Sequence, residues 1–157
     1  MQKRMKENPL STEAIATLLR TEAVGRLATV GADGCPYIIP VHYVHLDGKI
    51  YIHGLAAGEK IDNIRRNPLV GFEVDNMEGL IHGDEPCNTN TRFQSVVIRG
   101  KAFMVENPDE KRAALDAIVA KHAPRHSGES YPDSMLKMTA VIGVRVESCT
   151  GKRYPGE

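Results

Sequence analysis

The stretch YIIPVHYVHLDGKIYIH, residues 37–53, decides the fold because it holds two β-type runs around a two-residue turn. The first run, residues 37–46, is rich in Ile, Val and Tyr, and the second, residues 49–53, follows directly after Asp47-Gly48. An Asp-Gly pair between two such runs is the strongest short-range hairpin signal, since both turn positions need positive φ. The stretch therefore predicts an antiparallel hairpin.

Further β-type runs and three short helical segments surround this hairpin. Strands are predicted over residues 25–30, 69–74, 93–105 and 139–146, and loops over residues 79–92 and 122–133. Gly100 is expected to bend the strand that contains it. Ser11 and Asn107 are typical helix N-caps, and a third helix over residues 58–66 ends before Pro68.

Six or so mostly antiparallel, hairpin-connected strands with short helices between them predict a mainly β protein, a small barrel decorated by helices. The chain has 157 residues, the length of one ordinary domain. We therefore expect a single domain over residues 1–157, in which residues 1–10 form a flexible arm. The common phosphate-loop patterns GxGxxG and GxxxxGK[ST] are missing from the sequence.

Composition excludes several classes of protein. Twenty Lys plus Arg balance twenty Asp plus Glu, so the formal net charge is zero, which argues against a nucleic-acid or anionic-membrane surface. No apolar run approaches the roughly 18–20 residues that span a bilayer, and the basic N-terminus has no apolar segment behind it. Cys35, Cys87 and Cys149 are far apart and unpaired in pattern, which indicates free thiols in a reducing compartment. We expect a cytoplasmic protein.

The segment His53-Gly54-Leu55-Ala56-Ala57-Gly58-Glu59-Lys60 carries the most specific chemistry. A strand ends in a histidine, passes through small residues and enters a helix with a lysine in its first turn. Small residues let a ligand approach the backbone, and helix N-terminal amides favour an anion. The segment therefore predicts a site for one phosphate, with an ordinary strand-turn-helix and a solvated lysine as the alternative.

Pro40 interrupts an otherwise regular strand, and it predicts either a sheet edge or a bulge. An interrupted ladder leaves backbone amides and carbonyls free, and a flat heterocycle with donor and acceptor groups could dock there. A proline that protects an edge strand against aggregation is the other interpretation.

The six histidines raise the question of a metal site. His42 and His45 are three residues apart on a strand, so they point to opposite faces and cannot share an ion. His82 and Cys87 share an acidic loop without a regular ligand spacing, and His122 falls in a segment expected to be solvated. We predict that the protein holds no metal.

Eight short segments occur in one order along nearly the whole chain. They are residues 25–29, 34–41, 51–54, 58–60, 67–70, 94–100, 110–111 and 150–152. In this order they resemble the FMN-binding split β-barrel family, the pyridoxamine-phosphate-oxidase-like flavoproteins, and within it the branch of nitroimidazole-resistance reductases. The resemblance implies a split β-barrel that forms a homodimer, with two FMN sites at the subunit interface.

The resemblance also implies roles for individual residues. The main chain of the first strand of the hairpin would contact the isoalloxazine ring through Tyr37, Ile38, Ile39, Pro40 and Val41. His53, Gly54 and Lys60 would hold the phosphate, and His53 would also be the catalytic residue that acts on the substrate. Ser95 and Val96 would reach the site from the partner subunit.

The resulting expectation is an FMN-dependent oxidoreductase that passes reducing equivalents to a small acceptor, with a nitroaromatic or nitroimidazole as one candidate. Three alternatives remain open: a related barrel that binds haem through His53 or His122, a flavin-binding protein without turnover, and a cofactor-free interaction module. The chain lacks the longer arginine-rich C-terminal region of true pyridoxamine-phosphate oxidases, which argues against that exact reaction. Residues 79–92 depart from the family pattern, so the electron donor and acceptor stay open.

Overall fold

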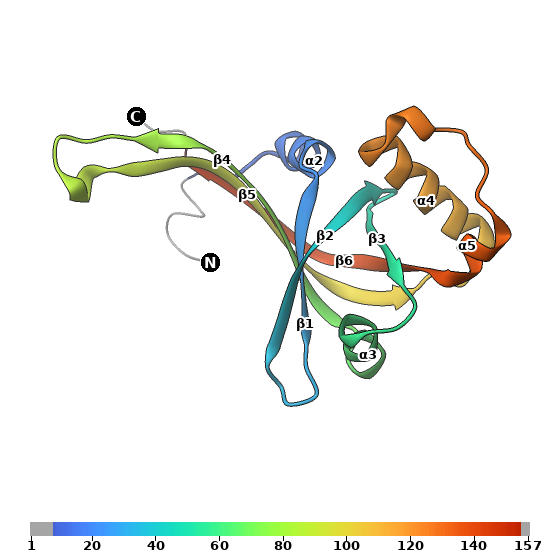
Figure 1. The fold of residues 1–157 in the computed structure, drawn as a ribbon. Coiled ribbons are helices and arrows are strands. Elements are labelled where there is room, and N and C mark those ends of the chain that lie inside the picture. The colour runs from blue at the N-terminus through green and yellow to red at the C-terminus, as the bar shows by residue number, and fades with distance from the viewer. Residues whose placement is uncertain (1–7, 155–157) are drawn as a thin grey trace.

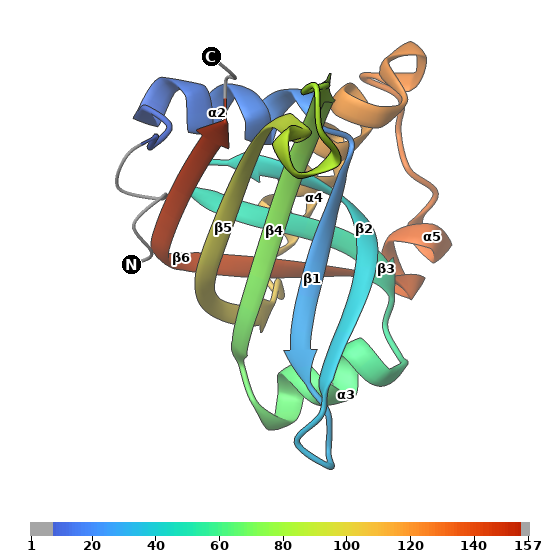
Figure 2. The same cartoon turned by 90° about the vertical axis from the view of Figure 1, so that its left-hand side faces the viewer.

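The computed structural model describes residues 8–154 and shows six antiparallel strands around a barrel (Figures 1 and 2). The order around the barrel is β1-β2-β3-β6-β5-β4, and pairing between β1 and β4 closes it. The strands are β1 (Val24–Val30), β2 (Pro36–Leu46), β3 (Lys49–Leu55), β4 (Leu69–Ile81), β5 (Asn90–Met104) and β6 (Thr139–Tyr154). The predicted mainly β split-barrel fold with short helices is confirmed.

Helices cover the two ends of the barrel and one of its sides. They are α2 (Thr12–Thr21), α3 (Glu59–Arg66), α4 (Pro108–His122) and α5 (Asp133–Met138), with 3-10 turns η1 (Pro86–Asn88) and η2 (Pro124–His126). Figure 2 shows α2 and α3 at opposite ends of the strands. Ser11 and Asn107 cap α2 and α4 as predicted, because their side chains accept hydrogen bonds from first-turn amides. Within residues 8–154, no helix is both long and apolar enough to cross a membrane.

The hairpin of β2 and β3 forms where the sequence predicts it. Asp47 and Gly48 have φ values of 49° and 73°, which a two-residue turn between twisted strands requires. Leu46 pairs with Lys49 directly across this turn. The local turn chemistry therefore fixes the register of the two strands that border the candidate site.

β2 has a free edge over part of its length. Residues 36–42 pair with β1, whereas only residues 43–46 pair with β3. β3 instead pairs with β6 along its whole length, from Lys49 to Leu55. One edge of residues 36–42 therefore has no strand beside it, and this is where the barrel is split.

Two apolar cores hold the elements in place. The first fills the barrel, where the rings of Tyr43 and Phe72 meet edge to face at 4.9 Å between centroids. The second lies between α4 and the outer side of β2, β3 and β6, and its buried members include Tyr51, Leu115 and Val141. This second core fixes α4 beside the end of β3, next to the predicted phosphate segment.

Three segments differ from the sequence predictions. Residues 79–92 are predicted as a loop, but β4 continues to Ile81 and β5 begins at Asn90, so both ends of the segment belong to a two-stranded arm that projects from the barrel (Figure 1). β6 continues to Tyr154, because it pairs with β5 along nearly its whole length. The α5 helix follows the loop predicted over residues 122–133.

The start of the described chain is packed against β6. The carbonyl of Asn8 accepts from the Arg153 amide at 3.0 Å, and the Leu10 amide donates to the Gly151 carbonyl at 3.1 Å. Leu10 itself is buried in the barrel core. The flexible arm predicted over residues 1–10 is therefore corrected for residues 8–10, while residues 1–7 lie outside the described residues.

Candidate functional site

The free edge of β2 offers acceptors at regular spacing but few donors. The Gly31 amide donates to the Cys35 carbonyl at 2.8 Å, and bonded and non-bonded pairs alternate along an antiparallel ladder. The residues of β2 that turn their backbone toward the free edge are therefore Pro36, Ile38, Pro40 and His42. Since proline has no N–H, the edge presents N–H groups only at Ile38 and His42.

The position of Pro40 confirms one prediction and corrects another. It lies on a sheet edge, as predicted, and it pairs with Arg26 of β1 in an uninterrupted register. Because its backbone faces away from β1, the missing N–H removes no bond from the β1–β2 ladder. Pro40 therefore does not interrupt that ladder, and the donor that it removes belongs to the free edge.

The side chains of this strand alternate between two faces. Tyr37, Ile39 and Val41 are half-buried, and Ile39 and Val41 pack against the barrel core. Ile38 is 61% exposed and Pro40 is also exposed, on the outer face. Within residues 37–41, the main chain of Ile38 and Pro40 faces the open edge, which fits the predicted contact with a flat ring, whereas the backbone groups of Tyr37, Ile39 and Val41 face β1.

The structure brings His53, Gly54 and Lys60 together. The Lys60 side chain folds back over Gly54, and a Cβ atom on Gly54 would lie 3.2 Å from Lys60 Nζ. Gly58 begins α3 with a φ of 118°, which favours glycine, and no side chain caps the first helical amides. Glu59 adds a carboxylate in the same turn. Glycine at position 54 and uncapped amides beside a lysine fit the phosphate of FMN.

Three imidazoles meet where β2 and β3 separate. Tyr43 and Ile52 form the last pair of the two strands, so His42 and His53 are the next residues along each strand. His122, the last residue of α4, stacks on His42, and its Nε2 lies 2.9 Å from the Tyr43 carbonyl oxygen. Since a carbonyl only accepts, His122 Nε2 must carry a proton and donate it.

This cluster lowers histidine pKa values. The pKa of His53 lies below the ordinary value of 6.5, first because of burial and then because of the charges of His42, His122 and Lys60. Burial also lowers the pKa of His122, against the opposing effect of the Tyr43 carbonyl. At neutral pH the imidazoles of His53 and His122 are therefore uncharged.

His122 corrects an expectation from the sequence. It is predicted in a solvated segment, but it ends α4, is partly buried and has partners on β2. Its hydrogen bond to Tyr43 leaves only Nδ1 for a metal or haem iron. In the part of the chain that the structure describes, no group of three or more His, Cys, Asp or Glu side chains is arranged to hold a metal ion.

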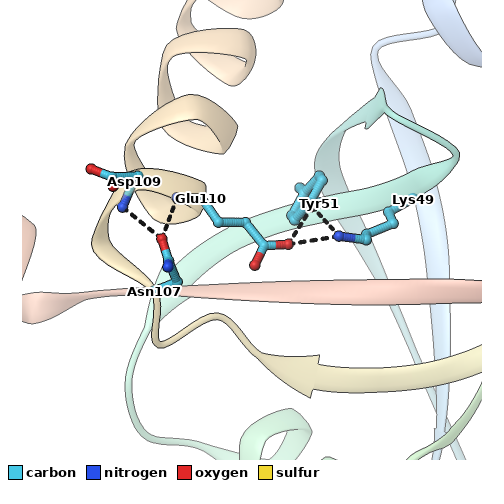
Figure 3. A network of polar contacts seen from close by, with 5 residues as sticks. All are labelled: Lys49, Tyr51, Asn107, Asp109 and Glu110. Carbon is cyan, nitrogen blue, oxygen red and sulfur yellow. Dashed lines mark hydrogen bonds and ion pairs between the residues drawn. The ribbon is translucent and has the colours of Figure 1, made fainter.

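A polar network fixes the start of α4 onto β3 (Figure 3). Glu110 Oε1 accepts from the Tyr51 hydroxyl at 2.6 Å and from Lys49 Nζ at 2.9 Å. These bonds, that from Tyr51 first, lower the pKa of Glu110. With Asn107 as the cap, the network holds the helix in an orientation that places His122 at the opposite end, against β2.

Ser95 and Val96 lie on a different part of the barrel. Both belong to β5, which is separated from β2 by β1 and β4. The Val96 side chain is wholly buried in the barrel core, so only its main chain is available to a ligand. Ser95 lies on the opposite face, between Asp75 and Lys152. One chain does not bring these residues to His53, and their place in a partner's site stays a prediction.

The outer face of β1, β2, β4 and β5 carries exposed apolar side chains beside a group of charged residues. Its exposed apolar side chains are Val24, Val30, Ile38, Leu69 and Val97, each between 36% and 61% exposed. A hollow of about 420 Å³ lies on this face beside the small residues Ala28 and Gly71. Arg26 pairs there with Glu73 and Asp75. Exposed apolar side chains around a hollow are typical of an interface.

Comparison with known proteins supports the same family as the sequence resemblance. Residues 11–153 match the family model described as pyridoxamine 5'-phosphate oxidase. A curated relative from Streptomyces rimosus, a 5a,11a-dehydrotetracycline/5a,11a-dehydrooxytetracycline reductase, is 38% identical over 121 residues, which cover 73% of this chain and 79% of that protein.

Two solved structures have the same fold. One, described as a 5-nitroimidazole antibiotic resistance protein from Bacteroides thetaiotaomicron, has a TM-score of 0.80 at 25% identity and covers 92% of this chain and 86% of that chain. The other, an FAD-binding protein from Mesorhizobium loti, has a TM-score of 0.66 at 26% identity and covers 93% and 96%. The family model spans nearly the whole barrel, and with the reductase relative it shows that this chain belongs to the pyridoxamine 5'-phosphate oxidase family.

Proposed function

We propose that this protein is an FMN-dependent oxidoreductase that passes reducing equivalents to a small acceptor. The observation that carries this proposal is the meeting of His53, Gly54 and Lys60 beside the free edge of β2. A phosphate subsite and an open backbone edge are the two features that a flavin mononucleotide needs. The reductase that is 38% identical to this chain supports the oxidoreductase class.

Each part of the site has a distinct task. The free edge, through the N–H groups of Ile38 and His42 and the carbonyls beside them, binds the ring of the flavin. Lys60 and the uncapped amides of α3 bind its phosphate. FMN supplies the redox chemistry when it is bound, and the protein supplies position, electrostatics and exclusion of water. His53 holds or moves a proton at the substrate.

The proposal includes a homodimer, in which each FMN lies at the subunit interface. The exposed apolar side chains on the outer face of β1, β2, β4 and β5 support this, because exposure of Ile38, Leu69 and Val97 to water is unfavourable. In the dimer, Ser95 and the main chain of Val96 complete the partner's site. The cysteines are free and exposed, which fits a reducing compartment such as the cytoplasm.

A nitroaromatic compound is the acceptor that we propose within this class, and one of the solved structures supports it. The solved structure described as a 5-nitroimidazole antibiotic resistance protein shares the fold over 92% of this chain. In addition, the pKa of His53 is lowered, so the imidazole beside the site carries no charge at neutral pH and does not repel or trap a neutral substrate.

The absorption spectrum of the purified protein, before and after addition of FMN, tests the proposal. We expect a flavin spectrum, stoichiometric FMN binding and oxidation of reduced nicotinamide when a nitroaromatic is added. A Soret band in place of a flavin spectrum would establish the haem-binding alternative. Binding of FMN without turnover would establish a non-catalytic flavin protein, and binding of neither cofactor would leave a cofactor-free interaction module.

A further inference from the structure

A half-open, mainly apolar cavity of about 200 Å³ lies beside His53, and apart from His53 its lining residues lie outside the segments that are expected to contact the flavin. Leu115, Ile118 and Val119 of α4 form one wall of it. Met135 and Leu136 of α5 form the opposite wall. The side chains of α4 and α5 therefore leave a space between them instead of filling the second core completely.

Among residues 8–154, no charged side chain lines this cavity at neutral pH. Its polar lining consists of His53, Thr139 and Tyr131. Burial and the neighbouring Asp116 raise the pKa of Tyr131 to about 12, and its hydroxyl donates to Asp116 Oδ1 at 2.8 Å. The pKa of His53 is lowered, so its imidazole is neutral. An ionised ligand would lose part of its hydration without gaining a counter-charge, so the cavity favours uncharged molecules.

The volume of the cavity limits the size of its ligand. An apolar cavity of about 150 Å³ is enough to hold benzene, whereas drug-sized ligands occupy about 300–1,000 Å³. A cavity of about 200 Å³ therefore accommodates one aromatic ring with a small substituent. A rigid system of three or four fused rings does not fit without movement of α5.

The wall of the cavity that α5 forms can change its conformation. α5 has six residues and no side-chain cap, and Lys111 Nζ holds it to α4 by a bond to the Leu136 carbonyl at 2.6 Å. The bond from Tyr131 to Asp116 holds the loop before it. Met135 is half exposed, and its flexible thioether side chain can change rotamer to admit a ring.

We propose that this cavity is a binding site for an uncharged, single-ring aromatic molecule, and that His53 lies between this cavity and the flavin site. One part of this inference rests on the proposed function, namely that the aromatic molecule bound in the cavity is the electron acceptor of the flavin. Of the residues that the structure describes, His53 is the one whose side chain belongs to both places: it lines the cavity, and it lies beside Lys60 and His42 at the end of the free edge.

Direct binding of nitrobenzene to the flavin-loaded protein tests the site, with 4-nitrobenzoate as a charged probe of nearly the same shape. Changes in the methyl NMR signal of Met135 report occupancy without any turnover. We expect nitrobenzene to bind at least about tenfold more tightly than 4-nitrobenzoate. Equal affinity for the two probes would contradict an uncharged cavity.

Two pairs of variants locate the site. Val119→Phe fills the cavity from α4, and we expect it to weaken nitrobenzene binding about tenfold or more, whereas Ala120→Phe on the exposed side of the same helix leaves it unchanged. Met135→Trp blocks the cavity from α5 with less risk to folding, because residue 135 is half exposed, and Met138→Trp is its control. Unchanged nitrobenzene binding in both Val119→Phe and Met135→Trp would overturn the proposal.

Reduction of ferricyanide separates this inference from the proposed function, because ferricyanide accepts electrons from a reduced flavin without entering an apolar cavity. If Met135→Trp loses nitrobenzene reduction but keeps ferricyanide reduction, the cavity is the acceptor site. If the wild-type protein binds nitrobenzene but reduces neither compound, the oxidoreductase function fails while the binding site stands. If the wild-type protein reduces both compounds but nitrobenzene does not affect Met135, the cavity proposal fails alone.

Discussion

The His42 ring stacks on the His122 ring, with the centroids 4.5 Å apart and the planes 16° apart. The contact joins the end of α4 to the point where β2 leaves β3. His122 also donates to the Tyr43 carbonyl, so the helix supports this point through both a ring and a hydrogen bond. A positive charge on either ring would be repelled by a charge on the other, which makes the junction sensitive to protonation.

Replacement of His42 tests the electrostatic coupling within this cluster. His42→Phe keeps an aromatic ring for the stack but removes the imidazole whose charge lowers the pKa of His53. We expect the pKa of His53 to rise toward its ordinary value, because a like charge no longer opposes its protonation, while burial and Lys60 continue to lower it. An NMR titration of the imidazole Cε1–H signals measures this shift.

His45→Phe is the matched control for this titration. His45 is on the same strand, but it is not among the groups that lower the pKa of His53. We expect no movement of the His53 titration in this variant. Equal shifts in His42→Phe and His45→Phe, or no shift in either, would contradict the arrangement of the cluster.

Lys121 gives the protein a pH-dependent stability on the alkaline side. Its ammonium lies 3.7 Å from the centroid of the Tyr43 ring and donates to the Leu19 carbonyl at 3.0 Å. Burial lowers its pKa from 10.5 to about 8, against the attraction of Glu22. Between pH 8 and 10.5 the unfolded chain therefore binds more protons than the folded chain, and the free energy of unfolding rises with pH over this window.

Lys121→Met should remove this rise. We expect the free energy of unfolding, measured with urea from pH 8 to pH 10.5, to increase in the wild-type protein relative to Lys121→Met. Lys101→Met, which removes an exposed lysine paired with Glu147, should follow the wild-type curve. A constant difference between wild type and Lys121→Met across the window would show that Lys121 keeps its ordinary pKa.

Pro40→Val tests the role of the free edge. The change adds an N–H to the free edge and none to the β1–β2 ladder, so we expect no gain in stability. We expect instead a loss of about 0.4–1 kcal/mol, since valine has more freedom in the unfolded chain. FMN should bind more weakly, because another strand can now pair with the edge that the ring is proposed to contact.

Pro36→Val is the control for this change, because Pro36 faces the same free edge outside residues 37–41. It should lose a similar amount of stability and keep its FMN affinity. If Pro40→Val raises aggregation, measured by light scattering, but leaves FMN affinity unchanged, then Pro40 only protects the edge.

The sequence contains enough information for the parts of the fold that local chemistry decides. The Asp47-Gly48 turn, the Asn107 cap and the alternating pattern of β2 are all visible in a few consecutive residues. Residues 79–92 mislead because they are polar, yet backbone pairing between Leu80 and Thr91 extends both strands regardless of side-chain chemistry. The low strand propensity of these residues is therefore outweighed by backbone pairing that continues the register of β4 and β5.

The site is predictable only in part, for a physical reason. His53, Gly54 and Lys60 are close in the sequence, so a strand, a turn and one helical turn suffice to bring them together. The contact of His122 with His42 depends on the packing of α4 onto β2, and no local pattern carries that information. The cavity beside His53 is equally hidden, since Leu115 and Val119 form an ordinary apolar stripe whether or not the space before them is filled.

Lys60→Met tests the phosphate assignment. A hydrogen bond to a charged group contributes about 1.5–3 kcal/mol, so we expect FMN to bind about 10- to 150-fold more weakly. Riboflavin has the same ring and ribityl chain without the phosphate, and its affinity should barely change. Fluorescence titration of both ligands against both proteins forms a thermodynamic cycle that isolates the contact between lysine and phosphate.

Arg65→Met separates this direct contact from general electrostatics. Arg65 adds a positive charge to the last turn of the same helix, where it is exposed and lies 3.8 Å from Asp62. Arg65 lies at the opposite end of α3 from the proposed phosphate, and salt screens the interaction between such exposed, separated charges. We therefore expect only a small effect on FMN binding. If Lys60→Met weakens FMN and riboflavin equally, the change has damaged the fold or the ring site. If it weakens neither ligand, Lys60 is a solvated helix lysine that folds over Gly54 without holding a phosphate. Loss of FMN affinity alone, in Lys60→Met and not in Arg65→Met, is the result that places the phosphate at the start of α3.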